Sequence, residues 1–305
     1  MLREFFMPGI AAGLVLFGAG CSDSSGPGGG ASADALTAAQ VQQLGGDIVL
    51  DAAEMFEVSS FDPATGIPMV MMGPAGGRPP APPTLCVTIS PFPPVNSDGD
   101  IVPDSVRFDF AGCVFTHHRG QITDSLDGTI DIIDPLPLAT SYGVRHVFTQ
   151  FTRARMNEAF PARSFIAVHD GTREWGASPD TLGHTITDFV SQWIHPGGFT
   201  STHKKNWAGK FTALTPGAIQ PGQPLPGGTW TLDGTSAWER GGRTWSVVTA
   251  TTVPLVFDPA CDVPPMLTAG SLHLVVTRNG GVTDIDITFT ACGQYTVTRT
   301  PVVTS

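Results

Sequence analysis

The sequence predicts an all-β protein: a large, curved antiparallel meander sheet with one N-terminal amphipathic helix packed on it. Three observations lead to this fold class. Apolar and polar residues alternate in most segments after residue 85, Gly-rich turns separate these segments, and only one stretch has helical periodicity. We expect the sheet to form an open half-barrel, with a two-sheet sandwich as the alternative.

The predicted helix begins at Thr37. Thr37-Ala-Ala-Gln40 is a capping box, in which two polar side chains satisfy backbone N–H groups, and Leu36 with Val41 forms the accompanying hydrophobic staple. Apolar residues then recur at spacings of three and four, at Val41, Leu44, Ile48, Ala52 and Met55. This single apolar stripe predicts that the helix lies on one face of the sheet.

Roughly a dozen strands are expected from residue 85 onward. Val106, Phe108 and Phe110 alternate with charged residues, and two hairpins are predicted around Gly241-Gly242 and Asn279-Gly280. Further strands are expected at 142–151, 164–168, 184–193 and 210–214. Residues 62–84 contain too many prolines and glycines for a regular element and predict a long loop.

The composition excludes some classes of partner. The formal charge is −11, and the 16 basic residues form no basic run, so nucleic acid is not an expected partner. Glycine (36 residues) and proline (27) make up about a fifth of the 305 residues, which is below the level typical of low-complexity disorder. Residues 36–305 are therefore predicted to fold as one domain.

The first 21 residues, MLREFFMPGIAAGLVLFGAGC, contain an apolar stretch too short to span a bilayer and then small residues before a cysteine. This segment resembles the type II signal peptide of bacterial lipoproteins. The resemblance implies cleavage after residue 20 and lipid attachment at Cys21, and the Ser22 that follows implies the outer membrane rather than the inner. An ordinary secretory signal is the alternative. Residues 21–35 are Gly/Ser-rich and predict a flexible tether.

The other four cysteines form an even set, which predicts two disulfides in an exported protein. Val106–Cys113 and Ile285–Cys292 share a template of alternating apolar residues, a small residue and cysteine, and each follows another cysteine by about 30 residues. This repetition predicts the pairs Cys86–Cys113 and Cys261–Cys292, each joining a strand pair.

The segments FDFAGC, GTWTLDGTSAWERGGRTWSV, PLVFDPAC and ITFTACGQYTVTR together resemble a large group of uncharacterised bacterial surface lipoproteins. The resemblance covers approximately residues 85–299. It implies an all-β lipoprotein of the cell envelope and carries no catalytic residues.

One loop has the pattern of a calcium site. Asn96, Asp98, Asp100 and Asp104 place oxygen side chains at relative positions 1, 3, 5 and 9, and calcium requires six to eight oxygen ligands. The loop resembles the calcium-binding loops of thrombospondin type 3 repeats, although Ile101 replaces their glycine. The alternative is an Asx-rich turn between strands. If an ion binds, its role is structural.

The sequence favours a non-enzymatic protein. It has no GxSxG, HExxH or P-loop motif, and only six glutamates for paired-carboxylate chemistry. Six tryptophans raise the alternative of a carbohydrate-binding face, although Trp230 and Trp245 share strand faces with Leu232 and Val247, which favours burial. We expect a membrane-anchored envelope lipoprotein with a structural or recognition role and a glycan or envelope protein as partner. The alternatives are a carbohydrate- or apolar-ligand-binding module and an envelope hydrolase.

Overall fold

A computed structural model describes residues 36–56, 86–100, 102–117, 121–138, 142–161, 164–196, 198–220, 223–263 and 265–300. They belong to one compact unit, Asp34–Ser305. The predicted signal segment 1–20, the lipid-attachment residue Cys21, the tether 21–35 and the loop 62–84 lie outside the described residues.

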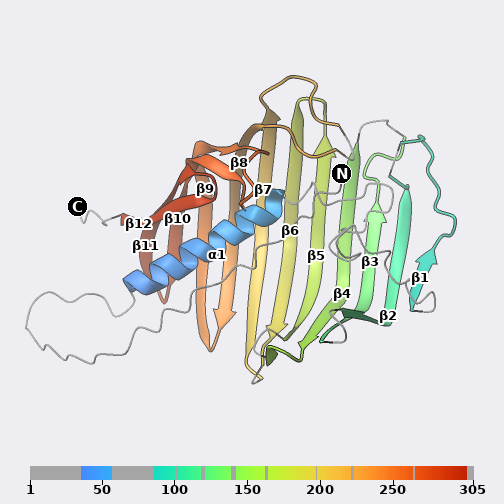
Figure 1. Ribbon diagram of the computed structural model, residues 1–305, viewed down its shortest axis with the longest axis horizontal. Coiled ribbons are helices and arrows are strands. Elements are labelled where there is room, and N and C mark those ends of the chain that lie inside the picture. The colour runs from blue at the N-terminus through green and yellow to red at the C-terminus, as the bar shows by residue number, and fades with distance from the viewer. Residues whose placement is uncertain are drawn as a thin grey trace, which may run out of the picture. The chain divides into compact units, whose positions relative to one another are not determined.

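The described residues form twelve strands of one sheet, and the spatial order of these strands is their order in the chain (Figure 1). Every strand pairs antiparallel with the strand before it, and β1 and β12 form the two edges, so the sheet is an open meander. The predicted fold class is confirmed, and the sandwich alternative is wrong. The strands are β1 (Val87–Ser90), β2 (Ser105–His117), β3 (Ile122–Ile133), β4 (Gly143–Asn157), β5 (Phe165–Ala177), β6 (Thr181–Ile194), β7 (Thr200–Ala213), β8 (Gly228–Arg240), β9 (Arg243–Phe257), β10 (Leu267–Arg278), β11 (Gly281–Ala291) and β12 (Gln294–Thr300).

The predicted helix is α1 (Ala38–Phe56). The capping box is formed: the Gln40 backbone N–H donates to Thr37 Oγ1 at 3.3 Å, and the Thr37 N–H donates to Gln40 Oε1 at 2.9 Å. The whole predicted stripe is buried, with Ile48, Ala52 and Met55 at 0 % exposure. Amphipathic periodicity therefore located both the helix and the face that it buries.

α1 lies across one face of the sheet, which we call the inner face (Figure 1). In the first half of α1, the α-carbon of Gly45 lies so close to β12 that an added Cβ would be 2.7 Å from the Val297 methyl groups. Near its end, the Met55 carbonyl oxygen is 3.2 Å from Nδ1 of His184 on β6. The helix thus spans from the last strand to the middle of the sheet. Among the residues that the structure describes, no helix is long and apolar enough to cross a membrane.

The inner face forms the core. Trp175, Trp207 and Trp230 are almost fully buried there, together with aliphatic residues of β8 to β11 such as Leu232 and Ile285. Each fully buried aliphatic or aromatic side chain of this kind contributes about 1.5–3 kcal/mol through the hydrophobic effect. Burial of one continuous apolar face by neighbouring strands and by α1 is the principal stabilising term of the sheet.

The core also contains a charged cluster at the contact between α1 and β7. The Asp51 carboxylate, 5 % exposed, lies 3.5 Å from Lys205 Nζ and 3.2 Å from His203 Nε2. Ser236 donates to the same carboxylate at 3.4 Å. A buried carboxylate is tolerated only with such partners, because its desolvation is costly. This cluster fixes the rotation of α1 on the sheet.

A line of β-bulges crosses the sheet. Register shifts occur near the middle of every ladder from β2–β3 to β6–β7. Bulges bend strands and increase their twist, so a continuous line of bulges curves the whole sheet.

Three copies of Asp-Gly-Thr lie at register shifts: those at Asp127 and Asp170 belong to this line of bulges, and the one at Asp233 lies at a shift between β8 and β9. In the first two copies the aspartate accepts a hydrogen bond from the backbone N–H of a bulged residue on the preceding strand: Asp127 accepts from Gly112, and Asp170 accepts from Gln150. The glycines that follow, Gly128 and Gly171, have positive φ and lie against the backbone of the next strand. The repeat therefore supplies both the hydrogen-bond acceptor and the space that the bulges require.

Both predicted disulfides are present, Cys86–Cys113 and Cys261–Cys292. The first joins the start of β1 to β2, which are paired strands. The second joins the β9–β10 connection to the turn between β11 and β12, so it links two connections at one end of the sheet rather than a strand pair. The covalent pairing was predicted correctly, and the element joined by the second bond was not.

Candidate functional site

The aspartate loop leads from β1 into β2, and hydrogen bonds within it hold two of the four predicted metal ligands. Asn96 Oδ1 accepts the Gly99 N–H at 2.8 Å, and Asn96 Nδ2 donates to the Asp100 carbonyl oxygen. Asp104 accepts from the Ser97 N–H at 2.7 Å and from the Ser97 hydroxyl at 2.5 Å. These contacts are those of an Asx-rich turn, and they use Asn96 and Asp104 to shape the loop.

The other two predicted ligands converge with a third carboxylate that the sequence did not suggest. One ligand oxygen from each of Asp98, Asp100 and Asp134 lies within 4.8 Å of the other two. Asp134 is 3 % exposed. Each of the three has an Oδ2 atom that is buried and has no hydrogen-bond partner among the described residues. We call this group the aspartate site.

The second oxygen of each carboxylate is bound to the backbone. Oδ1 of Asp98 accepts the Asp100 N–H at 3.1 Å, Oδ1 of Asp100 accepts the Val102 N–H at 2.6 Å, and Oδ1 of Asp134 accepts the Leu136 N–H at 2.7 Å. These bonds fix each carboxylate by one oxygen, so the free oxygens are held in place before any ligand arrives.

The electrostatics of the aspartate site are unfavourable without a cation. Burial raises the pKa of the Asp100 carboxyl, and the charges of Asp98 and Asp134 raise it further. Burial also raises the pKa of the nearby Tyr142 to about 12, with a smaller contribution from the Asp100 charge. Within the described part of the chain, no Lys, Arg or His forms an ion pair with the three carboxylates.

Strand register explains how Asp134 reaches this loop. Ser105, the first residue of β2, pairs with Ile133, the last residue of β3. In an antiparallel pair the residue after one strand lies beside the residue before the other, and the Asp134 N–H donates to the Asp104 carbonyl oxygen at 3.2 Å. Asp134 could have been found only by assigning β3 and its register, because it is 30 residues from Asp104 in the sequence.

The arrangement is suited to a hard divalent cation. Three carboxylates provide three oxygen ligands, and calcium completes its coordination with backbone carbonyls and water. The site offers no thiolate or imidazole among its ligands, which makes zinc or copper a poor match. The cluster contains two of the four residues predicted as ligands, Asp98 and Asp100, together with Asp134, which was not predicted; Asn96 and Asp104 are not part of it.

The structure divides the six tryptophans into two groups. Trp175, Trp207 and Trp230 are at most 2 % exposed and fill the core. Trp193, Trp238 and Trp245 are half-buried. Burial was expected for Trp230 and is observed, whereas Trp245 keeps part of its surface accessible.

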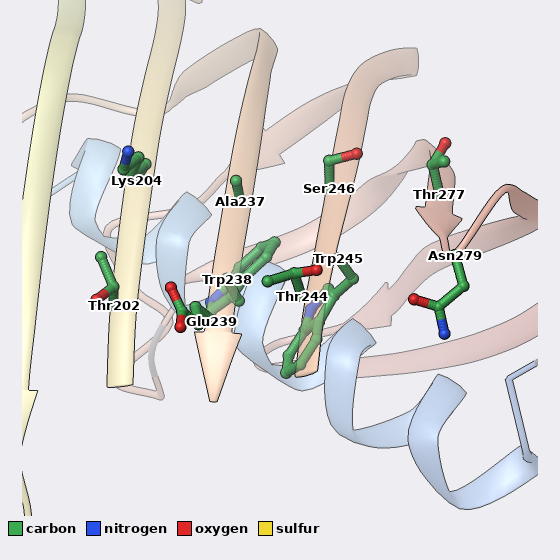
Figure 2. Close-up of a pocket in the computed structure, with 10 residues that line it drawn as sticks. All are labelled: Thr202, Lys204, Ala237, Trp238, Glu239, Thr244, Trp245, Ser246, Thr277 and Asn279. Atoms are coloured by element: carbon green, nitrogen blue, oxygen red, sulfur yellow. The ribbon is translucent and has the colours of Figure 1, made fainter. Parts of the chain in front are cut away.

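Trp238 and Trp245 form an aromatic stack at one end of the sheet. They lie directly opposite each other on β8 and β9, with ring centroids 6.3 Å apart and an interplanar angle of 15°. His203 of β7 continues the stack on Trp238 at 4.4 Å and 14°. Figure 2 shows the two indole rings side by side on neighbouring strands; Thr202 and Ser246, next in sequence to His203 and Trp245, project from the opposite face of the sheet.

Two cavities adjoin this stack. One, of about 320 Å³, is lined by Trp238 and Trp245 with Thr, Ser, Lys and Glu side chains of β7 to β10 (Figure 2). The other, of about 430 Å³, lies between α1 and the ends of β8, β9 and β10, and Trp245 lines it too. Both volumes fall within or near the range of small-ligand sites. Trp245 therefore contributes surface to two neighbouring cavities.

No protein-family model, curated protein or solved structure matches this chain.

Proposed function

We propose that the protein is a non-enzymatic module of the cell envelope, anchored to the outer membrane through a lipid on Cys21 and stabilised by a structural calcium ion. The observation that carries the calcium proposal is the aspartate site: one carboxylate oxygen from each of Asp98, Asp100 and Asp134 lies within 4.8 Å of the other two, and each residue has a buried Oδ2 without a hydrogen-bond partner among the described residues. A bound dication removes the mutual repulsion of the three carboxylates, and it ties the β1–β2 loop to the end of β3.

The test is a thermal unfolding series on the purified chain with calcium or with a chelator. At a calcium concentration about 50-fold above the dissociation constant, binding stabilises by about 2 kcal/mol, which corresponds to about 4–8 °C in a domain of this size. Asp134→Asn removes the buried charge with little change in shape and is expected to abolish the shift. Asp262→Asn, at an exposed aspartate in the β9–β10 connection, is the matched control.

A calcium-dependent shift in wild type and Asp262→Asn but not in Asp134→Asn supports the site. Equal shifts in all three proteins contradict it. The anchor is tested separately by Cys21→Ser, which is expected to move the protein from the membrane fraction to the soluble fraction. Unchanged fractionation contradicts lipid attachment at Cys21.

A second candidate function is carbohydrate recognition at the Trp238–Trp245 stack. Indole faces bind the apolar faces of sugar rings, and a polar, partly exposed setting suits the hydroxyl groups of a sugar. Two half-buried indoles stacked at one end of the sheet, of which Trp245 lines the cavity under α1, are the observation that favours it. Retention on immobilised polysaccharide that is lost in Trp238→Ala, with unchanged melting temperature, is the result expected.

A further inference from the structure

The cavity between α1 and the sheet, which we call the hairpin pocket, has more basic than acidic residues in its lining, although the chain as a whole is acidic. Three arginines line it: Arg240, Arg243 and Arg278. Asp47 of α1 is the one acidic residue among its lining residues. A local excess of two positive charges thus occurs in a chain whose formal charge is −11.

Topology brings these arginines together. Arg240 and Arg243 pair across the β8–β9 turn, and Arg278 ends β10 at the β10–β11 turn. Because β9 runs antiparallel between β8 and β10, both turns lie at the same end of the sheet. Residues almost 40 positions apart therefore face one cavity.

The three guanidinium groups are available. Among the residues that the structure describes, none of them forms a hydrogen bond or an ion pair, and Arg240 has only a longer-range charge interaction with Asp47 and with His195. Other arginines of the sheet do form ion pairs, for example Arg107 with Asp131 at 2.7 Å and Arg155 with Asp124 at 2.7 Å. The absence of such partners at the hairpin pocket leaves planar donor groups that match a carboxylate.

The remaining lining adds features of a sugar site. Trp245 presents indole surface, and its Nε1–H is buried without a hydrogen-bond partner in the described residues. On the opposite wall, Gln40 and Gln43 of α1 provide amide groups and Asp47 a carboxylate acceptor; the Gln40 oxygen already accepts from Thr37, which leaves its NH2 group as donor. A cavity of about 430 Å³ is of the size that holds a small ligand.

We propose that the hairpin pocket binds an acidic saccharide, with the ligand carboxylate held by Arg240, Arg243 and Arg278 and a sugar ring against Trp245. Asp47 and the two glutamines then accept from and donate to the sugar hydroxyls. The proposal rests on the carbohydrate-recognition candidate and specifies the ligand as anionic. The hairpin pocket shares no residue with the aspartate site, so a negative result for the pocket does not affect the calcium proposal.

The test compares two soluble probes by calorimetry at low and high salt: digalacturonate, which carries carboxylates, and the matched neutral digalactose. We expect digalacturonate to bind more tightly than digalactose, with an affinity that falls as salt rises. Arg243→Gln is expected to weaken digalacturonate binding by about tenfold or more, because a hydrogen bond to a charged group is lost. Arg299→Gln, which removes an exposed arginine of β12 outside the pocket, is the control.

Trp245→Ala is expected to weaken both probes, since both present sugar rings. Three results overturn the proposal. If digalactose binds as tightly as digalacturonate, sugar recognition stands and the anionic specificity fails. If Arg243→Gln and Arg299→Gln lower affinity equally, the effect is general charge attraction. If neither probe binds and inorganic phosphate does, the pocket is a simple anion site and both sugar proposals fail.

Discussion

Substitution of Gly171 by alanine is expected to be among the most destabilising single-methyl changes in this protein. Gly171 lies in the bulge of β5 with φ +125°, and a Cβ there would be 2.5 Å from the Phe189 α-carbon and 2.6 Å from the Asp188 carbonyl oxygen. Carbon atoms in contact are normally about 3.5–4.0 Å apart. The backbone of β6 would therefore have to move by about 1 Å.

Two costs add at this position. An alanine in a glycine-only region of φ/ψ costs about 1–3 kcal/mol, and overpacking of a fixed neighbour costs about another 1–3 kcal/mol. We expect a loss on the order of 4 kcal/mol in the free energy of unfolding. This is a large fraction of the 5–15 kcal/mol that is typical of folded domains.

Two other glycines separate these costs. Gly112 has φ +62° with no atom within 4 Å of an added Cβ, so Gly112→Ala is expected to show only the backbone cost, about 1 kcal/mol. Gly176, also on β5, has neither a positive φ nor a close neighbour, so Gly176→Ala is expected to be neutral or stabilising by a few tenths to 1 kcal/mol.

Urea unfolding followed by tryptophan fluorescence measures all three variants, and an unchanged m-value shows that the unfolded states are comparable. The expected order of stability is Gly176→Ala, Gly112→Ala, Gly171→Ala. A Gly171→Ala variant within 1 kcal/mol of Gly176→Ala would refute the argument that the close contact between β5 and β6 requires glycine.

Three further predictions concern the core. Burial lowers the pKa of His146 to about 3, so below pH 6.5 protons bind preferentially to the unfolded chain. The free energy of unfolding should therefore decrease as the pH is lowered from 6.5, by up to about 1.4 kcal/mol per pH unit. Urea unfolding across this pH range should show a smaller decrease in His146→Phe than in the wild type. Replacing both Cys86 and Cys113 by serine opens a loop with a sequence separation of 27 and should cost about 3–4 kcal/mol by the same measurement, while an unchanged midpoint would contradict the loop-entropy argument. Lys205→Met should cost about 3–5 kcal/mol because the Asp51 carboxylate stays buried without its ammonium partner, and Asp51→Asn combined with it should recover part of that loss in a double-mutant cycle.

Local patterns were sufficient for the helix, the hairpins and the disulfides. Each of these features is encoded within a few residues: the capping box at Thr37, the Asn279-Gly280 turn, and the template of alternating apolar residues that precedes both Cys113 and Cys292. Their outcome does not depend on distant parts of the chain, and so they could be predicted from the sequence alone.

Long-range pairing could not be predicted in the same way. Only residues 210–214 of β7 were expected as a strand, because its first half, with His203 and Lys205, is polar on the inner face and breaks the usual alternation. Those polar residues are buried because Asp51 of α1 lies against them. β3 was not assigned, since Asp124, Asp127 and Asp131 obscure its apolar face, and Asp134 was missed with it.

The contact between α1 and β12 has a consequence for the order in which the chain can fold. Each strand pairs only with its sequence neighbour, so the sheet can grow from one end as the chain emerges. α1 precedes all the described strands in the chain, but Gly45 packs against Val297 and Gln42 donates to the Val297 carbonyl oxygen at 2.9 Å, on β12, the last described strand. Among the described elements, the first therefore has no complete docking surface until the last is in place, and α1 then lies against the edge strand β12.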